Sequence, residues 1–492
     1  MDSVSLLNTQ GIIFLFVYLF SLLGIGVLGH FSKKENNLGD FYLANRGMSG
    51  FVLFLTLYAT QYSGNTMIGF SGRAYRQGFT SLVTITFMCA IVGLYFIYAP
   101  KLYNLSKKHK FITLGDYVDY RFNSAALVIS ISIISIIALG NYILTNLKAI
   151  GFLVEGVTGG QVSFINAIII LSFIMVAYET LGGMRSVAWT DMIQGILLLI
   201  GVVAIFIIVH YEYGGISVIS TKLQKIRPDF WDIPSWNDKL LWFSTILIVS
   251  IGVSVYPHAI QRIYAARSAS VLKKSLQIMV FMPFVTTLFM VIVGIVGASE
   301  IVGLDRIDSE QISILLLADL IEKIPSVAWL LIIFLAAAIA AIMSTVDSAL
   351  LAISSIVTQD LYRKIKPFSN QKDLLIIGKV VSWLIMLIAV VMAIYLPQTI
   401  WQLFQIKLEL LCQIAPAIYF GIHFKTIDKK AILYGLYIGT SLALFIMIGN
   451  WIDPRFPSKP FGVHAGLWGL IVNVIVIYFY AKYQLSLKRK IS

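Results

Sequence analysis

Residues 336–356 read AAAIAAIMSTVDSALLAISSI, an apolar stretch of small residues with hydroxyl groups near its middle. On a helix of about 3.6 residues per turn, Ala341, Ser344, Thr345 and Ser348 share one face. Hydroxyl and free carbonyl oxygens suit a dehydrated monovalent cation, because their dipoles replace its water without adding full charge. Small polar residues also allow helices to pack closely in lipid, so the stretch has two interpretations.

The composition is typical of a helical membrane protein with many spans. Hydrophobic residues make up 58% of the 492 residues, 12% are charged, and the mean hydropathy is +0.86. A soluble domain has about one quarter charged residues, whereas a bilayer is crossed by about 20 apolar residues. The sequence predicts an all-α fold with about thirteen spans, at residues 9–29, 51–72, 78–99, 123–153, 162–181, 187–209, 240–263, 276–298, 326–356, 374–396, 399–422, 431–450 and 464–482.

The net charge of +13 is distributed as an orientation signal rather than as a nucleic-acid surface. Most of the 37 lysines and arginines fall in alternate loops, including a group at Arg262, Arg267, Lys273 and Lys274. Because cytoplasmic loops are enriched in basic residues, this predicts a cytoplasmic-membrane protein with its N-terminus outside and its C-terminus inside. Of two long outer loops, 210–239 and 308–323, the second has helical apolar spacing after Asp308 and predicts a short amphipathic helix.

Two of the predicted spans are interrupted at bilayer depth. Polar residues and a glycine interrupt span 51–72 at residues 59–66, and a proline interrupts span 240–263 within residues 252–258. Irregular backbone at that depth is tolerated where it lines a cavity, and paired broken helices indicate the binding site of a secondary transporter. The pair predicts one domain over 1–492, with a 5+5 inverted repeat at approximately 51–209 and 240–422 and accessory spans 9–29, 431–450 and 464–482.

Two ionisable residues, Lys407 and Glu409, lie near the middle of span 399–422. A charge inside a membrane span is costly and indicates function. Their spacing directs them to different sides of a helix, so they are not expected to pair. Lys407 has two candidate partners, a carboxylate on a solute or a structural acid such as Glu179 or Asp347. The first would favour a solute that carries a carboxylate.

Nothing in the sequence indicates an enzyme. The six histidines are scattered, no nucleotide-binding loop is present, and the two cysteines lie inside apolar segments. No cofactor is expected.

Three stretches together resemble the sodium/solute symporter family, whose members include proline permease, pantothenate permease and sodium/glucose carriers. They are 59-ATQYSGNTMIGFSGRAYRQG-78, 181-LGGMRSVAWTDMIQG-195 and 337-AAIAAIMSTVDSALLAISSIVTQDLYRK-364. The resemblance covers essentially the whole chain. It implies a transporter that couples the inward sodium gradient to uptake of a small organic solute by alternating access, with sodium, the solute and the lipid bilayer as its partners.

The resemblance also implies which residues hold sodium. Carried over position by position, they are the carbonyls of Ala59, Tyr62 and Ala341 and the hydroxyls of Ser344 and Thr345. Asp191 would belong to the ion's exit path or, with Ser344 and Ser348, to a second sodium site; alternatively it caps the N-terminus of its helix. Some relatives have serine at the position of Asp347, where a carboxylate would raise cation affinity or could titrate.

The solute is implied to lie beside the break in span 51–72. The candidates are Gln61, Ser63, Asn65, Tyr142, Tyr256 and Gln405, with Lys407 added if the solute is a monocarboxylate, an amino acid or a pantothenate-like acid. Proline permease-like members have tryptophan at the position of Asn65 and aromatics at Val249 and Val253, which argues against proline. Alternatives to sodium symport are proton coupling through Asp191, Asp347 or Glu409, and a transporter-like membrane sensor.

Overall fold

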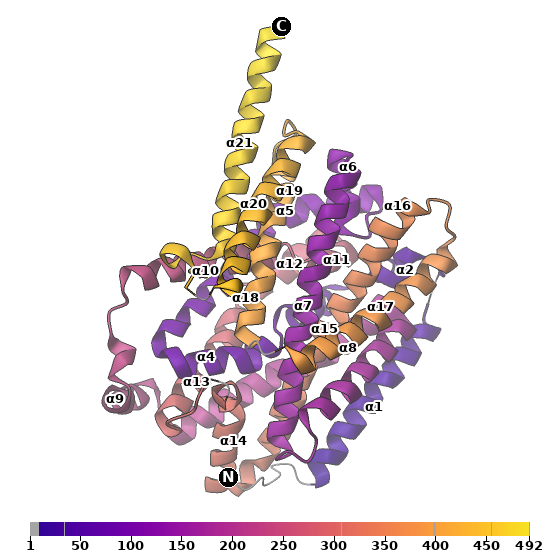
Figure 1. Cartoon of the computed structure of the whole chain (residues 1–492). Helices are drawn as coiled ribbons and strands as arrows, with labels where there is room; N and C mark the ends of the chain where they lie inside the picture. The colour runs from indigo at the N-terminus through magenta and orange to yellow at the C-terminus, as the bar shows by residue number, and fades with distance from the viewer. Residues whose placement is uncertain (1–8, 34, 307, 397–399, 454, 492) are drawn as a thin grey trace.

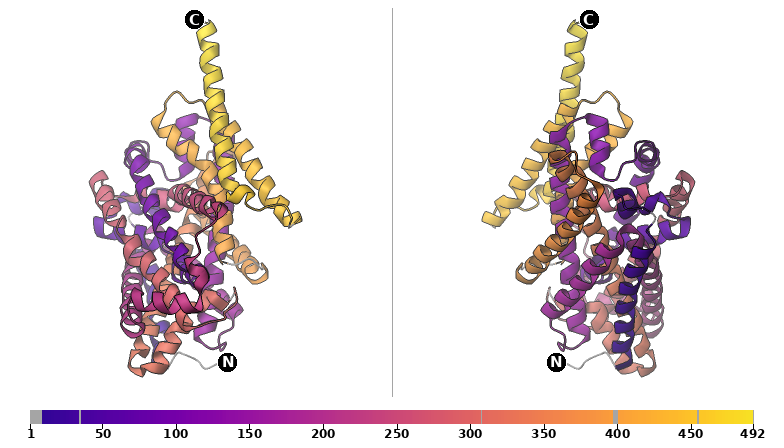
Figure 2. Two further views of the ribbon diagram at one scale, coloured as in Figure 1. Left: turned by 90° about the vertical axis from the view of Figure 1, so that its left-hand side faces the viewer. Right: turned by 90° about the vertical axis from the view of Figure 1, so that its right-hand side faces the viewer.

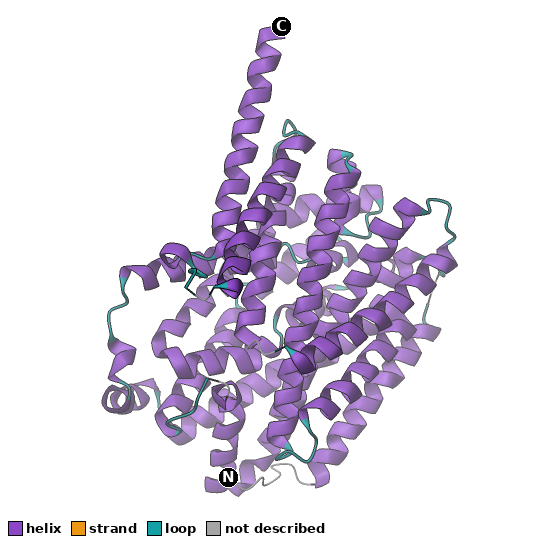
Figure 3. Cartoon of the chain, viewed as in Figure 1, coloured by secondary structure: helices purple, strands orange, loops and turns teal. Residues whose placement is uncertain are grey.

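The computed structural model describes residues 9–33, 35–306, 308–396, 400–453 and 455–491, which form helices and no strand (Figures 1 and 3). The elements of the first half are α1 (Thr9–Phe31), α2 (Leu38–Leu43), η1 (Ala44–Arg46), α3 (Gly50–Gln61), η2 (Asn65–Gly69), α4 (Phe70–Gln77), η3 (Gly78–Leu82), α5 (Val83–His109), α6 (Leu114–Phe122), α7 (Ala125–Val157), α8 (Phe164–Tyr213), α9 (Ile216–Ile226) and η4 (Pro228–Trp231). Those of the second half are α10 (Trp236–Ser254), α11 (Pro257–Ala265), α12 (Ala269–Met279), η5 (Pro283–Thr287), α13 (Leu288–Glu300), η6 (Asp308–Gln311), α14 (Ile312–Lys323), η7 (Pro325–Val327), α15 (Ala328–Ser355), η8 (Ile356–Tyr362), α16 (Arg363–Ile365), α17 (Gln371–Tyr395), α18 (Ile400–Leu411), η9 (Cys412–Ile414), α19 (Ala415–His423), α20 (Lys429–Ile452), η10 (Pro460–Gly462) and α21 (Ala465–Ile491).

The predicted all-α membrane fold is confirmed, but the count of thirteen spans is not. Among the described residues, ten helices are long and apolar enough to cross a membrane, or eleven if the bent pair α10–α11 is one span. The count is lower because two continuous helical stretches, Asn65–His109 and Phe164–Tyr213, each include parts of two predicted spans. The predicted helix over 308–323 is present as η6 and α14.

The last two helices form a pair at one side of the molecule. α20 packs against α21, which extends past the other helices at the end opposite the start of α1 (Figures 1 and 2). Glycines allow this close contact, since a Cβ on Gly439 would lie 2.5 Å from the carbonyl oxygen of Gly469.

Both predicted helix breaks are present, and neighbouring helices bind their backbone groups. α3 ends at Gln61, and the backbone amide of Gly64 donates to Asn146 Oδ1 of α7 at 3.1 Å. Between α10 and α11 the axis bends by 47°, and the Val253 carbonyl accepts a 3.3 Å hydrogen bond from the hydroxyl of Tyr95 on α5. These side chains stabilise non-helical backbone that lipid would leave without partners.

α15 is the buried helix on which both breaks converge. A Cβ on Gly64 would lie 2.6 Å from Ile342 of α15. From the other break, Gln261 of α11 donates to Ser355 Oγ at 2.6 Å. On another side α8 approaches closely, because Gly201 faces Ala337. The small residues of α15 therefore allow several helices to meet at its middle.

A third irregularity lies at Gly183, inside α8, between two predicted spans. Its φ of 60° and ψ of −149° are open essentially to glycine alone, and a Cβ there would lie 2.6 Å from the carbonyl oxygen of Phe41. Gly183→Ala is expected to destabilise the protein by about 2 kcal/mol or more, measured as a lowered Tm. Gly140→Ala is the control, because Gly140 is helical and has open space at its Cβ; equal Tm values for the two variants would contradict the assignment.

Candidate functional site

The predicted ion-binding face of α15 lies where this helix meets α3 and α8. Ser344 donates from Oγ to Asp191 Oδ1 of α8 at 2.6 Å. One turn further along, Ser348 Oγ lies 3.3 Å from Thr60 Oγ1 of α3. Thr345 donates to the carbonyl oxygen of Ala341 at 2.8 Å, which places those two oxygens side by side. All of these α15 residues are fully buried.

The broken end of α3 lies against the same part of α15, since a Cβ on Gly64 would lie 2.6 Å from Ile342. Because the helix ends at Gln61, the carbonyls of its last turn have no following helical amide to bind. Tyr62 is in an extended conformation, and both Ala59 and Tyr62 are fully buried. The structure thus brings the end of α3 against the part of α15 that carries the other three residues of the predicted sodium site.

Asp191 lies within α8 and binds side chains from three other helices, so its interpretation as a helix N-cap is wrong. Thr56 and Ser344 donate to its carboxylate, and Arg262 Nη2 of α11 lies 3.4 Å from Oδ2 in an ion pair with no solvent exposure. The same Nη2 donates to Ser348 Oγ. A guanidinium therefore bridges two of the residues suggested for a second ion site.

Asp347 lies near this ion pair but does not take part in it. Its Oδ2 accepts a hydrogen bond from the Tyr178 hydroxyl, while its buried Oδ1 has no partner among the described residues. Asp191 and Asp347 provide two buried carboxylates against the single guanidinium of Arg262. This corner of the site can therefore accept one further positive charge, from a cation or a proton.

Beside the break in α3 lies a small cavity of about 10 Å³, room for about one water molecule. Four of the predicted solute residues bear buried polar atoms with no hydrogen-bond partner in the described part of the chain: Gln61 Nε2, both side-chain atoms of Asn65, Tyr256 Oη and Lys407 Nζ. Buried polar groups normally have partners, so these are available to a ligand. The cavity is lined by Gln61, Ser63, Asn65, Thr66, Phe70, Met88, Ile91, Tyr142, Val253, Tyr256 and Phe404.

Lys407 extends its ammonium group into an aromatic cage at this cavity. Nζ lies 3.1 Å from the ring centroid of Tyr142, 4.7 Å from that of Phe404 and 5.5 Å from that of Tyr256. The side chain is fully buried, and neither Glu179 nor Asp347 pairs with it. The structural-acid alternative for Lys407 is therefore wrong. Aromatic faces attract a cation, but they do not neutralise its charge.

Two other residues of α18, Gln405 and Glu409, do not line the inner cavity. Glu409 Oε1 lies 3.1 Å from His464 Nδ1, so Lys407 and Glu409 do not pair, as their spacing predicts. Gln405 lines a different, larger cavity with Arg306 and Lys459, and is separate from the other predicted solute residues.

Comparison with known proteins shows the family. Residues 41–439 match the sequence profile described as the sodium:solute symporter family. The chain belongs to this family. A sodium/pantothenate symporter of Haemophilus influenzae is 27% identical over 80% of this chain and 81% of its own length. A sodium/proline symporter of Staphylococcus saprophyticus is 26% identical over 96% and 93% of the two chains.

The fold of this sodium:solute symporter also matches a solved structure. A sodium-coupled sialic acid symporter, in a substrate-bound outward-open state, superimposes with a TM-score of 0.80 at 20% identity over 97% of this chain and 98% of that one. The chain is thus a multi-pass membrane protein of a transporter family, and its helices form a symporter fold.

The sequence failed to identify one charged residue at the centre of this symporter. The distribution of basic residues predicts a cytoplasmic loop position for Arg262, whereas this residue is fully buried and pairs with Asp191. The sequence feature that indicates a buried Arg262 is its position four residues after His258, in the second half of a broken span. There its Nη1 donates to the His258 carbonyl at 3.3 Å.

Proposed function

We propose that this protein takes up a small organic solute bearing a carboxylate, coupled to sodium. It would act in the cytoplasmic membrane with its N-terminus outside and its C-terminus inside. Repeats at approximately 51–209 and 240–422 would move against each other around the central site. No chemical change of the solute is involved.

The observation that carries the proposal is the unpaired ammonium of Lys407 against the aromatic rings that line the small inner cavity. A fully buried cation without an anion carries a large desolvation cost, which a bound carboxylate would offset. The amides of Gln61 and Asn65 and the hydroxyl of Tyr256 have buried atoms free for further hydrogen bonds to the same solute. A neutral solute such as a sugar would leave the Lys407 charge uncompensated.

Sodium would lie at the crossing of α3 and α15, held by Ala59, Tyr62, Ala341, Ser344 and Thr345. This position adjoins the solute cavity, because the Tyr142 hydroxyl that helps to line the cavity lies near Ser63 and Thr345. Each ligand would order residues used by the other, and linkage then requires that each tighten the other's binding by the same factor.

Asp191 and Ser348 would serve the ion's exit path rather than a second sodium site. Arg262 contacts both residues, so a sodium ion between them would face a guanidinium group. Asp347 is the better place for any additional positive charge, since one of its oxygens is buried without a partner among the described residues. That oxygen also supports the second candidate function, uptake driven by protons.

Thr345→Ala is expected to raise the sodium concentration for half-maximal uptake about tenfold or more, because a hydrogen bond or ligand to a charged group contributes about 1.5–3 kcal/mol. Uptake assays across a sodium series measure this shift. Thr345→Ser keeps the hydroxyl and should retain most of the affinity. Thr180→Ala is the control, since its hydroxyl bonds the Val176 carbonyl of its own helix at 2.7 Å. Unchanged sodium dependence in Thr345→Ala would contradict the sodium site.

Proteoliposomes containing the purified protein test the function itself. Radiolabelled L-lactate, L-proline, D-pantothenate and D-glucose are offered under an inward sodium gradient, and separately under an inward proton gradient without sodium. The proposal predicts sodium-driven accumulation of a carboxylate and none of glucose. Accumulation under the proton gradient alone would support proton coupling, and glucose uptake would contradict the assignment of Lys407.

A further inference from the structure

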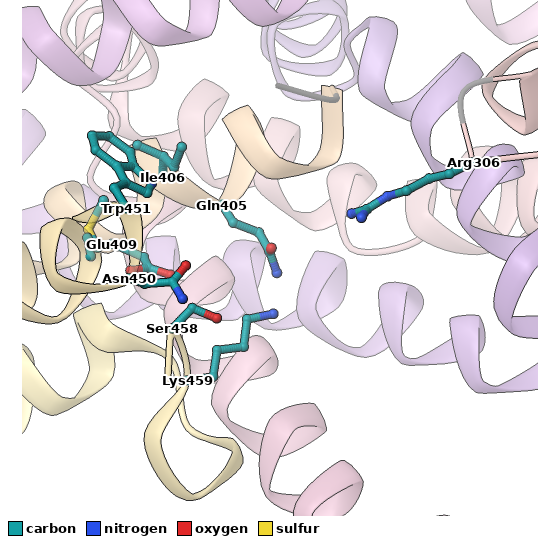
Figure 4. A pocket seen from close by; sticks show the side chains of 9 residues that line it. Arg306, Gln405, Ile406, Glu409, Asn450, Trp451, Ser458 and Lys459 are labelled. Carbon is teal, nitrogen blue, oxygen red and sulfur yellow. The ribbon is translucent and has the colours of Figure 1, made fainter. Parts of the chain in front are cut away.

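A second and larger cavity, of about 300 Å³, lies beside α18. Its walls come from α18, the end of α20, the segment before η10 and the segment before η6. Figure 4 shows the Gln405 amide and the Lys459 ammonium projecting into one space, with the Arg306 guanidinium pointing toward them from across it. In the orientation proposed above, the segment before η6, which carries Arg306, and the segment before η10, which carries Lys459, lie on the outer side of the membrane.

The cavity is electrostatically suited to an anion. Arg306 and Lys459 supply two cationic groups against one acid in the wall, Glu409, whose carboxylate also lies 3.1 Å from His464 Nδ1. Burial lowers the pKa of Lys459; Glu409 opposes this change, and Arg73 and Arg306 add to it. An anion beside Lys459 would relieve the repulsion among these positive groups.

One stretch of α18 separates this cavity from the inner one. Phe404 lines the inner cavity and lies 4.7 Å from Lys407 Nζ, whereas the next residue, Gln405, lines the outer cavity. A solute that leaves the outer cavity past Phe404 would thus arrive at the Lys407 ammonium.

We propose that the outer cavity is a reception site, in which Arg306 and Lys459 bind the carboxylate of the solute before it passes Phe404 to Lys407. This proposal rests on the proposed function for the carboxylate and adds a site to it. Positive charge in a concave site raises the local concentration of an anion and its association rate, and salt weakens both effects.

Trp451 lines this cavity and provides a probe of its charge. The fluorescence of Trp451 is obtained by subtracting the emission of the Trp451→Phe variant from that of the wild type. At constant ionic strength, Arg306→Gln/Lys459→Gln should reduce quenching of Trp451 by iodide about threefold and leave quenching by neutral acrylamide unchanged. Lys225→Gln, a cation elsewhere on the outer segments, should change neither. Unaltered iodide quenching in the double variant would overturn the proposal.

A second measurement asks whether the cavity holds a carboxylate. Millimolar L-lactate or D-pantothenate should protect Trp451 from iodide, and neutral lactamide should not. Protection should persist in Lys407→Gln and disappear in Arg306→Gln/Lys459→Gln. Protection that is absent, or that is lost in Lys407→Gln, would overturn the reception site. The two proposals fail separately, since full uptake by Lys407→Gln would contradict the proposed function without changing iodide quenching at Trp451.

Discussion

Replacement of Lys407 by glutamine should lower kcat/KM for solute uptake by about 30-fold or more, while the protein becomes at least as stable as the wild type. Removing one partner of a buried charge pair costs about 2–5 kcal/mol of binding, and each 1.4 kcal/mol is about tenfold. The ligand-free protein gains from the same change, because it no longer buries a cation without an anion. Transport and stability are therefore expected to change in opposite directions.

Two measurements on one preparation test this prediction: uptake into proteoliposomes and Tm without solute. Lys379→Gln is the matched control, a half-buried lysine of α17 near the ring of Phe41, and it should retain uptake. If Lys407→Gln instead lost several kcal/mol of stability, the lysine would be part of a structural ion pair. Wild-type uptake by this variant would exclude contact with the solute.

Asp191→Asn is expected to destabilise the protein by about 3–5 kcal/mol, because it removes the carboxylate that forms the ion pair with the fully buried guanidinium of Arg262. Thr56 and Ser344 also lose a carboxylate acceptor, although an amide oxygen replaces part of it. The double variant Asp191→Asn/Arg262→Met removes both charges and should recover much of the loss.

A double-mutant cycle with Arg262→Met alone completes the test, measured by thermal unfolding in sodium buffer. Residues of one buried pair should show an interaction energy of about 1–3 kcal/mol. Additive effects, or a loss below about 1 kcal/mol in Asp191→Asn, would show that the pair does not couple α8 to α11.

The helix breaks could be predicted from the sequence because irregular backbone requires particular residues. Gly64 allows the break to approach Ile342, and Pro257 begins α11 after α10 has ended. The oxygen face of α15 followed from helical periodicity alone. The opposite directions of Lys407 and Glu409 followed from their spacing in the same way.

Features that depend on packing between distant segments could not be predicted. Arg262 belongs to a run of basic residues that is typical of a cytoplasmic loop. Only the fold shows that it is buried and paired with Asp191, 71 positions away. Whether Phe404 or Gln405 faces the inner cavity depends on the rotation of α18 against α7 and α10, which the sequence of α18 does not fix. The span count depends on where helices continue through predicted loops, as α8 does apart from Gly183.

The most direct test of sodium-coupled solute binding is thermal unfolding of the purified protein in sodium and in potassium buffer, with each solute of the panel. A ligand that binds only the folded state stabilises it by RT ln(1 + [L]/Kd). The account predicts that one carboxylate raises the Tm more in sodium than in potassium, and that it tightens sodium binding by the same factor. An equal Tm shift in the two buffers would contradict sodium coupling.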